Sequence, residues 1–259
     1  MIHAAPRPYP LPCLESNHAA YRHAAPSCLK WRKSSCGGAA PRTHPAAMNA
    51  TAPLLDYAAL DGAPVADTPF RHILVANFLP PAALARVHAE LPRREKGGSF
   101  PPEALNLGPT AKALMAEMEG DRLKQTIATK LGLDLSDAPN MLTVRLYCRE
   151  KDGQIHTDSD AKRVTILLYM NPENDAFAAQ DGCLRLLRGP TDLDDYAVEV
   201  PPTNGTLLVF PNGPTTWHGH RPYVGQRFSL QLNYMTNDGK ARSELRRHKL
   251  SALVKGLAA

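Results

Sequence analysis

The chain has 259 residues, of which 43% are hydrophobic, and a formal net charge of +5. Its hydrophobic residues come in short runs, and none approaches the ~20 consecutive apolar residues that a membrane-spanning helix needs. We therefore expect no membrane partner. The whole positive excess lies in residues 1–47, which leaves the other 212 residues formally neutral. A neutral domain gains little from the charge of a phosphate backbone, so we expect no nucleic-acid partner.

The first 47 residues differ in composition from the rest of the chain. They hold seven of the 24 prolines and three of the five cysteines, without helical or strand periodicity. They lack the apolar core of a secretory signal, and their prolines argue against the amphipathic helix of a transit peptide. Because Met48 offers a natural start, we expect residues 1–47 to be a disordered leader or a mis-assigned extension ahead of a single domain, residues 48–259. The two remaining cysteines are too few for a disulfide framework, which favours a cytoplasmic protein.

The segment before residue 140 indicates helices. Residues 70–78 form a predicted strand, and a helix bounded by prolines follows it. Residues 95–109 carry turn residues throughout, so we expect a loop there that could serve as a lid. Residues 110–132 place apolar side chains at helical spacing and end in glycine. Together, residues 70–135 predict a helical support layer.

From residue 140 to 235 the pattern changes to short β-rich runs. Eight such runs occur in about 95 residues, separated by turn sequences at intervals of roughly ten residues. This density predicts an all-β sandwich or barrel, and a jelly roll is one of its closed forms. The fold class is therefore mainly β with supporting N-terminal helices. Residues 236–259 read as a polar turn followed by a helix.

The stretch GQIHTDSD, residues 153–160, places a histidine and a carboxylate one residue apart. In an extended segment His156 and Asp158 point to the same side, an arrangement that suits a metal ion. It equally suits a solvated strand end or a hydrogen-bonded His/Asp pair. A further histidine, His218, follows in TTWHGHR. Two histidines and one carboxylate form the facial triad of non-haem Fe(II) oxygenases, although zinc accepts the same ligands.

A charged residue near the end of the β-rich region indicates a binding site for a carboxylate. Arg227 lies nine residues after His218, at the start of the last predicted strand. A guanidinium is a planar, permanently charged fork that suits the far carboxylate of a 2-oxo acid. Tyr147 and Tyr169 are placed to reach the same cavity with hydroxyl donors, although strand tyrosines are often simply core residues.

Five segments carry a family resemblance: RLYCREKDGQIHTD, RVTILLYMN, DGCLRLL, GTLLVFPN and WHGHRPYVGQRFSL. Together they resemble the 2-oxoglutarate/Fe(II)-dependent dioxygenases, and within them the prolyl 4-hydroxylase-like group. The resemblance implies a double-stranded β-helix, or jelly-roll, core at about 140–235. It implies that His156, Asp158 and His218 ligate iron. It also implies that Arg227, assisted by Tyr169, binds the C5 carboxylate of 2-oxoglutarate, with Tyr147 near the C1/C2 end.

The chain departs from the family pattern at one turn and offers one rival ligand. Asp181-Gly182 stands where the family often has Gly-Gly. His220 lies two residues after His218 and faces the same way in a strand, but the distances from His218 to Pro222 and Arg227 fit the family better. Related halogenases replace the carboxylate with a small residue, so the presence of Asp158 favours hydroxylation.

The implied reaction hydroxylates an unactivated C–H bond, with succinate and CO2 as co-products. Its cofactors are Fe(II), 2-oxoglutarate and O2, with ascorbate as a reductant. The expected substrate is a prolyl or other amino-acid side chain of a peptide or protein; the alternative is a small molecule from biosynthesis. A jelly roll that binds metal and 2-oxoglutarate without turnover, and a zinc hydrolase, remain alternatives. Arg185, Ser229 and Gln231 are candidates to line the substrate end of the cavity.

Overall fold

The computed structural model describes residues 52–95 and 97–256, so the predicted boundary at residue 48 lies outside the described residues. The helices are α1 (Tyr57–Gly62), α2 (Pro81–Glu90), α3 (Pro109–Met118), α4 (Asp121–Leu131), α5 (Asp175–Ala178) and α6 (Gly239–Gly256), with a 3-10 turn at Pro102–Ala104. The strands are β1 (Val65–Ala66), β2 (His72–Val75), β3 (Ser99–Phe100), β4 (Asn140–Cys148), β5 (Lys162–Tyr169), β6 (Leu184–Leu187), β7 (Tyr196–Val200), β8 (Leu207–Pro211), β9 (His218–His220) and β10 (Gly225–Met235).

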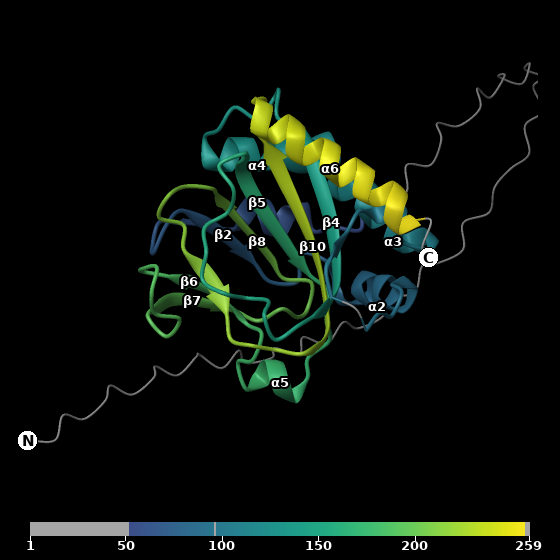
Figure 1. Cartoon of the computed structure of the whole chain (residues 1–259), viewed down its shortest axis with the longest axis horizontal. Helices are drawn as coiled ribbons and strands as arrows, with labels where there is room; N and C mark the ends of the chain where they lie inside the picture. Colours follow the sequence, from purple (N-terminus) through teal and green to yellow (C-terminus); the bar gives the residue numbers. More distant parts are fainter. Residues whose placement is uncertain (1–51, 96, 257–259) are drawn as a thin grey trace, which may run out of the picture. The chain divides into compact units, whose positions relative to one another are not determined.

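The strands form two antiparallel sheets. The larger has seven strands in the order β1-β2-β8-β5-β10-β4-β3, and the smaller has three in the order β7-β6-β9. Figure 1 shows β6 and β7 beside the large sheet. An apolar cluster joins the two sheets, because Leu184 and Leu186 of β6 pack with Leu208 and Phe210 of β8. The predicted fold class, mainly β with a jelly-roll core, is confirmed.

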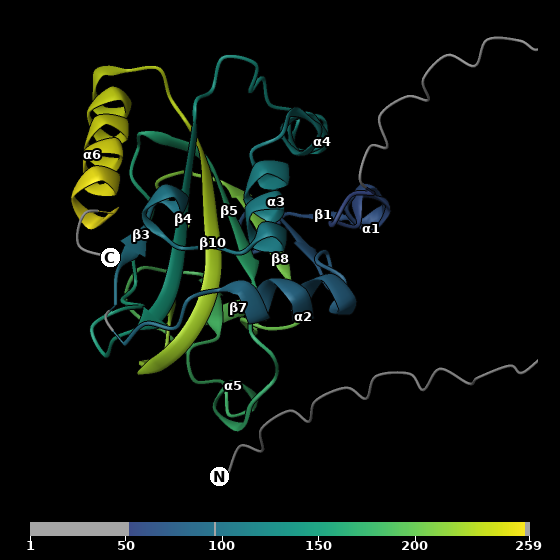
Figure 2. The same cartoon turned by 90° about the vertical axis from the view of Figure 1, so that its right-hand side faces the viewer.

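Helices α2, α3 and α4 cover one face of the large sheet, as Figure 2 shows. This face is apolar because side chains alternate along each strand. In β4, Leu142, Val144 and Leu146 are buried against the helices. Helix α4 contributes the stripe Leu123, Ile127 and Leu131 to the same core. The helices therefore bury one face of the sheet in the core, and the opposite face can carry a functional site.

Several predicted elements differ in their bounds from the observed ones. The predicted helix over residues 110–132 is two helices, α3 and α4, separated at Gly120. The predicted loop at residues 95–109 contains the short strand β3 and the 3-10 turn. The glycine stop after α4 is found as expected: Gly132 has a φ of 63° and caps the last turn with its N–H. Within the described part of the chain, no helix combines the length and apolar character that crossing a membrane requires.

Candidate functional site

His156 and His218 face each other across a short antiparallel bridge. The N–H of each residue donates to the carbonyl of the other at 3.0 Å, and the ring centroids lie 4.4 Å apart. His218 opens β9, whereas His156 lies in the loop after β4, so the expected strand around His156 is reduced to this single bridge. Gly153 allows the loop that carries His156 to lie close to β9. It has a φ of 91°, and a Cβ at this position would lie 2.3 Å from the ring of His220.

Both imidazole rings are oriented by backbone carbonyls. The Nδ1 of His156 lies 2.8 Å from the carbonyl oxygen of Gln154, and the Nδ1 of His218 lies 2.9 Å from that of Thr216. Because a carbonyl oxygen only accepts, each Nδ1 must carry the proton, which leaves Nε2 with its lone pair free. Burial, together with the neighbouring His156, lowers the pKa of His218 to about 4. His218 is therefore neutral near pH 7, the form that binds a metal.

Asp158 is held by two donors from β5. Its carboxylate accepts from the Nζ of Lys162 at 2.6 Å and from the Oγ1 of Thr165 at 2.6 Å. Burial alone would raise the pKa of Asp158, but the charge of Lys162 and the two hydrogen bonds outweigh it and hold the pKa below its usual range. An ionised carboxylate has about four acceptor positions, so both bonds leave capacity for a metal.

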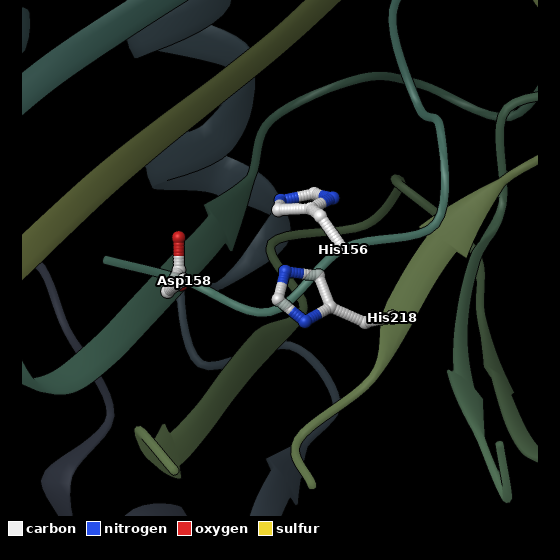
Figure 3. A group of neighbouring side chains, drawn as sticks. All are labelled: His156, Asp158 and His218. Carbon is white, nitrogen blue, oxygen red and sulfur yellow. The ribbon is translucent and has the colours of Figure 1, made fainter. Parts of the chain in front are cut away.

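These three side chains converge. One ligand atom from each of His156, Asp158 and His218 lies within 4.8 Å of the others, and the described residues contain no other such group of three (Figure 3). Two imidazoles with a single carboxylate suit ferrous iron, so the donor set fits the metal that the sequence suggests. His220 lies outside the group: its Nδ1 contacts the carbonyl of Arg221 at 2.8 Å and its Nε2 faces the Sγ of Cys148 at 3.9 Å.

The histidines open into a cavity of about 90 Å³ between the two sheets. Its lining includes His156, His218, Tyr169 and Arg227. Arg227 is only 4% exposed; its Nε donates to the carbonyl of Gly182 at 3.0 Å, and its guanidinium lies 5.2 Å from the ring centre of Tyr169. Burial raises the pKa of Tyr169 although the Arg227 charge opposes this, so the Tyr169 hydroxyl keeps its proton as a donor. A buried guanidinium without a carboxylate partner is costly, which marks the cavity as an anion site.

Comparison with known proteins agrees with this geometry. Residues 142–235 match the family model of the 2OG-Fe(II) oxygenase superfamily. Over this segment the chain is similar to that superfamily. The match contains every residue of the triad and Arg227, and the family description itself names 2-oxoglutarate and ferrous iron. No curated protein sequence matches the chain.

Solved structures with a similar arrangement include several prolyl hydroxylases. A prolyl-4-hydroxylase of Pseudomonas putida is 24% identical, with 64% of this chain and 86% of that chain covered and a TM-score of 0.49. A prolyl hydroxylase of Trichoplax adhaerens, solved with a hypoxia inducible factor peptide fragment, is 19% identical over 67% of this chain and 86% of that chain, with a TM-score of 0.47. A prolyl 4-hydroxylase of Phytophthora capsici is 15% identical over 80% and 79%, with a TM-score of 0.46.

Some of the remaining predicted residues line the cavity and others lie elsewhere. Ser229 and Gln231 line the cavity. Tyr147 is partly buried and does not line it. Arg185 also lies elsewhere: its Nε donates to Glu199 at 2.7 Å, and Asp194 pairs with the same guanidinium. Arg185 therefore links β6 to β7 through Glu199 and to the loop between these two strands through Asp194. It faces away from the cavity because neighbouring strand residues point to opposite sides and Leu184 lines the cavity.

Sequence reasoning missed three residues that belong to this region. Lys162 and Thr165 hold Asp158, and Arg145 of β4 lines the cavity. A signal for Arg145 was present, since it alternates with Tyr147 in RLYC and so shares its face. No local signal identified Lys162 and Thr165, because their contact with Asp158 depends on how the loop returns to β5.

Proposed function

We propose that the chain is a 2-oxoglutarate- and Fe(II)-dependent dioxygenase that hydroxylates an unactivated C–H bond, with succinate and CO2 as co-products. One observation carries this proposal: the ligand atoms of His156, Asp158 and His218 converge, and the two histidines line a cavity that also contains the buried guanidinium of Arg227. A zinc hydrolase would use the three metal-binding side chains, but it would leave the buried guanidinium of Arg227 without a role. The described residues that line the cavity also include no carboxylate to serve as the general base of such a hydrolase.

In this proposal His156 and His218 would bind iron through Nε2 and Asp158 through its carboxylate. Bound iron supplies O2 activation coupled to oxidative decarboxylation of 2-oxoglutarate, chemistry that no side chain provides. The carbonyls of Gln154 and Thr216 fix the orientation of both rings, and burial keeps His218 neutral. The protein also keeps Asp158 ionised, so the metal meets a charged ligand without a proton having to leave.

The 2-oxoglutarate would be oriented by the inner end of the cavity. Arg227 pairs with the C5 carboxylate, and the protonated hydroxyl of Tyr169 donates to the same group. Tyr147 is proposed to approach the C1/C2 end from β4. Burial of Arg227 excludes water from this contact, and exclusion of water strengthens the charge pair.

We propose a prolyl or other amino-acid side chain as the substrate, on the resemblance of the motifs to the prolyl 4-hydroxylase-like group. A small-molecule substrate is the alternative. Both fit a cavity whose walls mix hydroxyl, amide and guanidinium groups, so the two must be separated by experiment.

The test is turnover of 2-oxoglutarate by the purified full chain, loaded anaerobically with Fe(II) and then exposed to O2. We expect the purified chain alone to form succinate slowly. Cell extract, separated by ultrafiltration into a protein fraction and a small-molecule fraction, should make succinate formation faster. Mass spectrometry of the stimulating fraction should find a product that carries one added oxygen atom, derived from labelled O2. Absence of succinate from iron-loaded protein in both fractions would contradict the proposal, and His156→Ala serves as the inactive control.

A further inference from the structure

The cavity contains a second guanidinium that 2-oxoglutarate does not require. Arg145 of β4 lines the same space as Arg227. No Asp or Glu occurs among the described residues of this lining, so it combines two fixed positive charges with no negative side chain. The distal carboxylate of 2-oxoglutarate is satisfied by one planar guanidinium fork. One positive charge is therefore left for another anion.

Among the residues that the structure describes, no carboxylate pairs with the Arg145 guanidinium. Its only described contact is a long one, from Nη2 to the Oγ of Ser99 at 3.5 Å, and none of the ion pairs between described residues includes it. Asp152 is near enough for the charge of Arg145 to influence its pKa, but its carboxylate is already bonded to the backbone N–H and side chain of Arg149. A partly buried guanidinium without a counter-charge is able to bind an anionic ligand.

Arg145 and Arg227 enter the cavity from neighbouring strands, β4 and β10. Across the inner face, Arg145 pairs with Ser99 on one side and Ser229 on the other, and Ser229 pairs with Tyr169. Strands lie about 4.8 Å apart, so the backbone of Arg145 is about 10 Å from that of Tyr169, against which Arg227 packs. Arg227 itself lies on β10, two residues before Ser229, and its guanidinium packs against Tyr169 of β5, whereas Arg145 enters the cavity from β4.

Polar side chains surround Arg145. The Arg145 subsite is formed by Ser99, Thr143, Arg145, Ser229 and Gln231, all of which line the cavity. The register sets Gln231 opposite Thr143 in the row next to Arg145 and Ser229. Hydroxyl and amide groups beside a guanidinium are suited to the oxygens of a carboxylate, and they would not favour a purely apolar substrate.

We propose that Arg145 is a specificity-determining residue that binds a carboxylate of the substrate. The substrate is thus a free amino acid or a peptide with an acidic side chain close to the oxidised C–H bond. This inference rests on the proposed dioxygenase function, and it narrows the substrate class within it. A prolyl residue in a neutral peptide does not meet the requirement, whereas free proline or a prolyl residue beside an acid does.

The test measures binding without turnover, with the full chain loaded with Mn(II) and 2-oxoglutarate. Two matched pairs of probes separate the two sources of the carboxylate. L-Proline and L-prolinamide represent a free amino acid, and the capped dipeptides N-acetyl-Pro-Asp-amide and N-acetyl-Pro-Asn-amide represent an acidic peptide. In at least one pair we expect the acid to bind the wild type about tenfold or more tightly than the amide, as a charge-assisted hydrogen bond allows.

Arg145→Gln should reduce this preference to near unity, and Arg145→Lys should restore part of it. The control Arg188→Gln removes an exposed guanidinium that pairs with Asp195, and it should leave the preference intact. Equal binding of acid and amide to the wild type in both pairs, no binding of any probe, or a preference that survives in Arg145→Gln would each overturn the inference.

Titration with 2-oxoglutarate separates this failure from failure of the proposed function. We expect Arg227→Gln to weaken 2-oxoglutarate binding to the Mn(II) form at least about tenfold, and Arg145→Gln to change it less than about threefold. If wild type does not bind 2-oxoglutarate, the proposed function fails. If Arg145→Gln weakens 2-oxoglutarate as much as Arg227→Gln does, Arg145 belongs to the cosubstrate and the substrate inference is overturned.

Discussion

The two faces of the seven-stranded sheet differ although the same strands build both. Toward the helices, β10 presents Phe228, Leu230, Leu232 and Tyr234, all in one apolar cluster. Toward the small sheet, the alternate residues Ser229 and Gln231 line the cavity. Alternation along a strand thus places a hydrophobic core and a polar site within one residue of each other.

The difference between the faces separates stability from chemistry. The helix-facing side chains are buried against one another, so their replacement should change the free energy of unfolding. The cavity-facing side chains carry unpaired charges and donors, so their replacement should change binding. Adjacent residues on one strand therefore make matched tests of the two roles.

The largest effect is expected at the metal ligands. Asp158→Ala removes the only carboxylate of the group and should abolish succinate formation, because the charge that balances the metal is lost. Asp160→Ala removes a carboxylate two residues later whose side chain is 95% exposed, and it should keep wild-type turnover. Full turnover by iron-loaded Asp158→Ala would contradict the assignment of the site.

On the helix-facing side, Leu230→Ala should lower the free energy of unfolding by about 3 kcal/mol, since it leaves a cavity in a fully buried core. Ser229→Ala, its neighbour on the other face, should cost less than about 1 kcal/mol. Urea unfolding monitored by circular dichroism measures both. The distinction between the faces fails if the two variants lose equal stability.

Two buried arginines give the next comparison. Arg227→Gln should raise the dissociation constant of 2-oxoglutarate by about thirtyfold, the value of a charge-assisted hydrogen bond. Arg185→Gln removes a guanidinium that is 1% exposed but is paired with Glu199, so it should reduce stability by about 2 kcal/mol and leave 2-oxoglutarate binding nearly unchanged. Calorimetric titration measures the affinity for 2-oxoglutarate, and urea unfolding measures stability. A loss of affinity in Arg185→Gln, with only a loss of stability in Arg227→Gln, would contradict these roles.

The smallest effect is expected at Thr165, which orients Asp158. Thr165→Val keeps the shape of the side chain but removes the hydroxyl that donates to the carboxylate at 2.6 Å. We expect metal affinity to fall about tenfold, as for other groups that orient a ligand. Competition with a metal-binding dye measures this change. An affinity equal to that of the wild type would mean that Lys162 alone positions Asp158.

Much of the fold could be predicted because turn and alternation signals are local. The strong β pattern after residue 140 predicted the sheet region, and His156, Asp158 and His218 were selected by their spacing in two motifs. The break between α3 and α4 was missed, although the step from Met118 to Leu123 spans five residues and leaves the three-to-four spacing of a helix.

Side-chain direction at β6 could not be predicted from sequence. All four of its residues are buried, so hydrophobic alternation does not indicate which face of the strand is inward. Arg185 was therefore expected near the substrate, whereas in the structure Glu199 and Asp194 hold it outside the cavity. The contacts of Asp158 with Lys162 and Thr165 were equally inaccessible, because they depend on the path of a loop.

The most direct test of the central claim is anaerobic titration of the full chain with Fe(II) and 2-oxoglutarate, observed by visible absorption. Chelation of 2-oxoglutarate to iron in the group formed by His156, Asp158 and His218 should produce a metal-to-ligand charge-transfer band that requires both additions. We predict this band in the wild type and in Asp160→Ala, and its loss in Asp158→Ala. Wild-type protein that binds iron and 2-oxoglutarate without the band, or a full band in Asp158→Ala, would contradict the account.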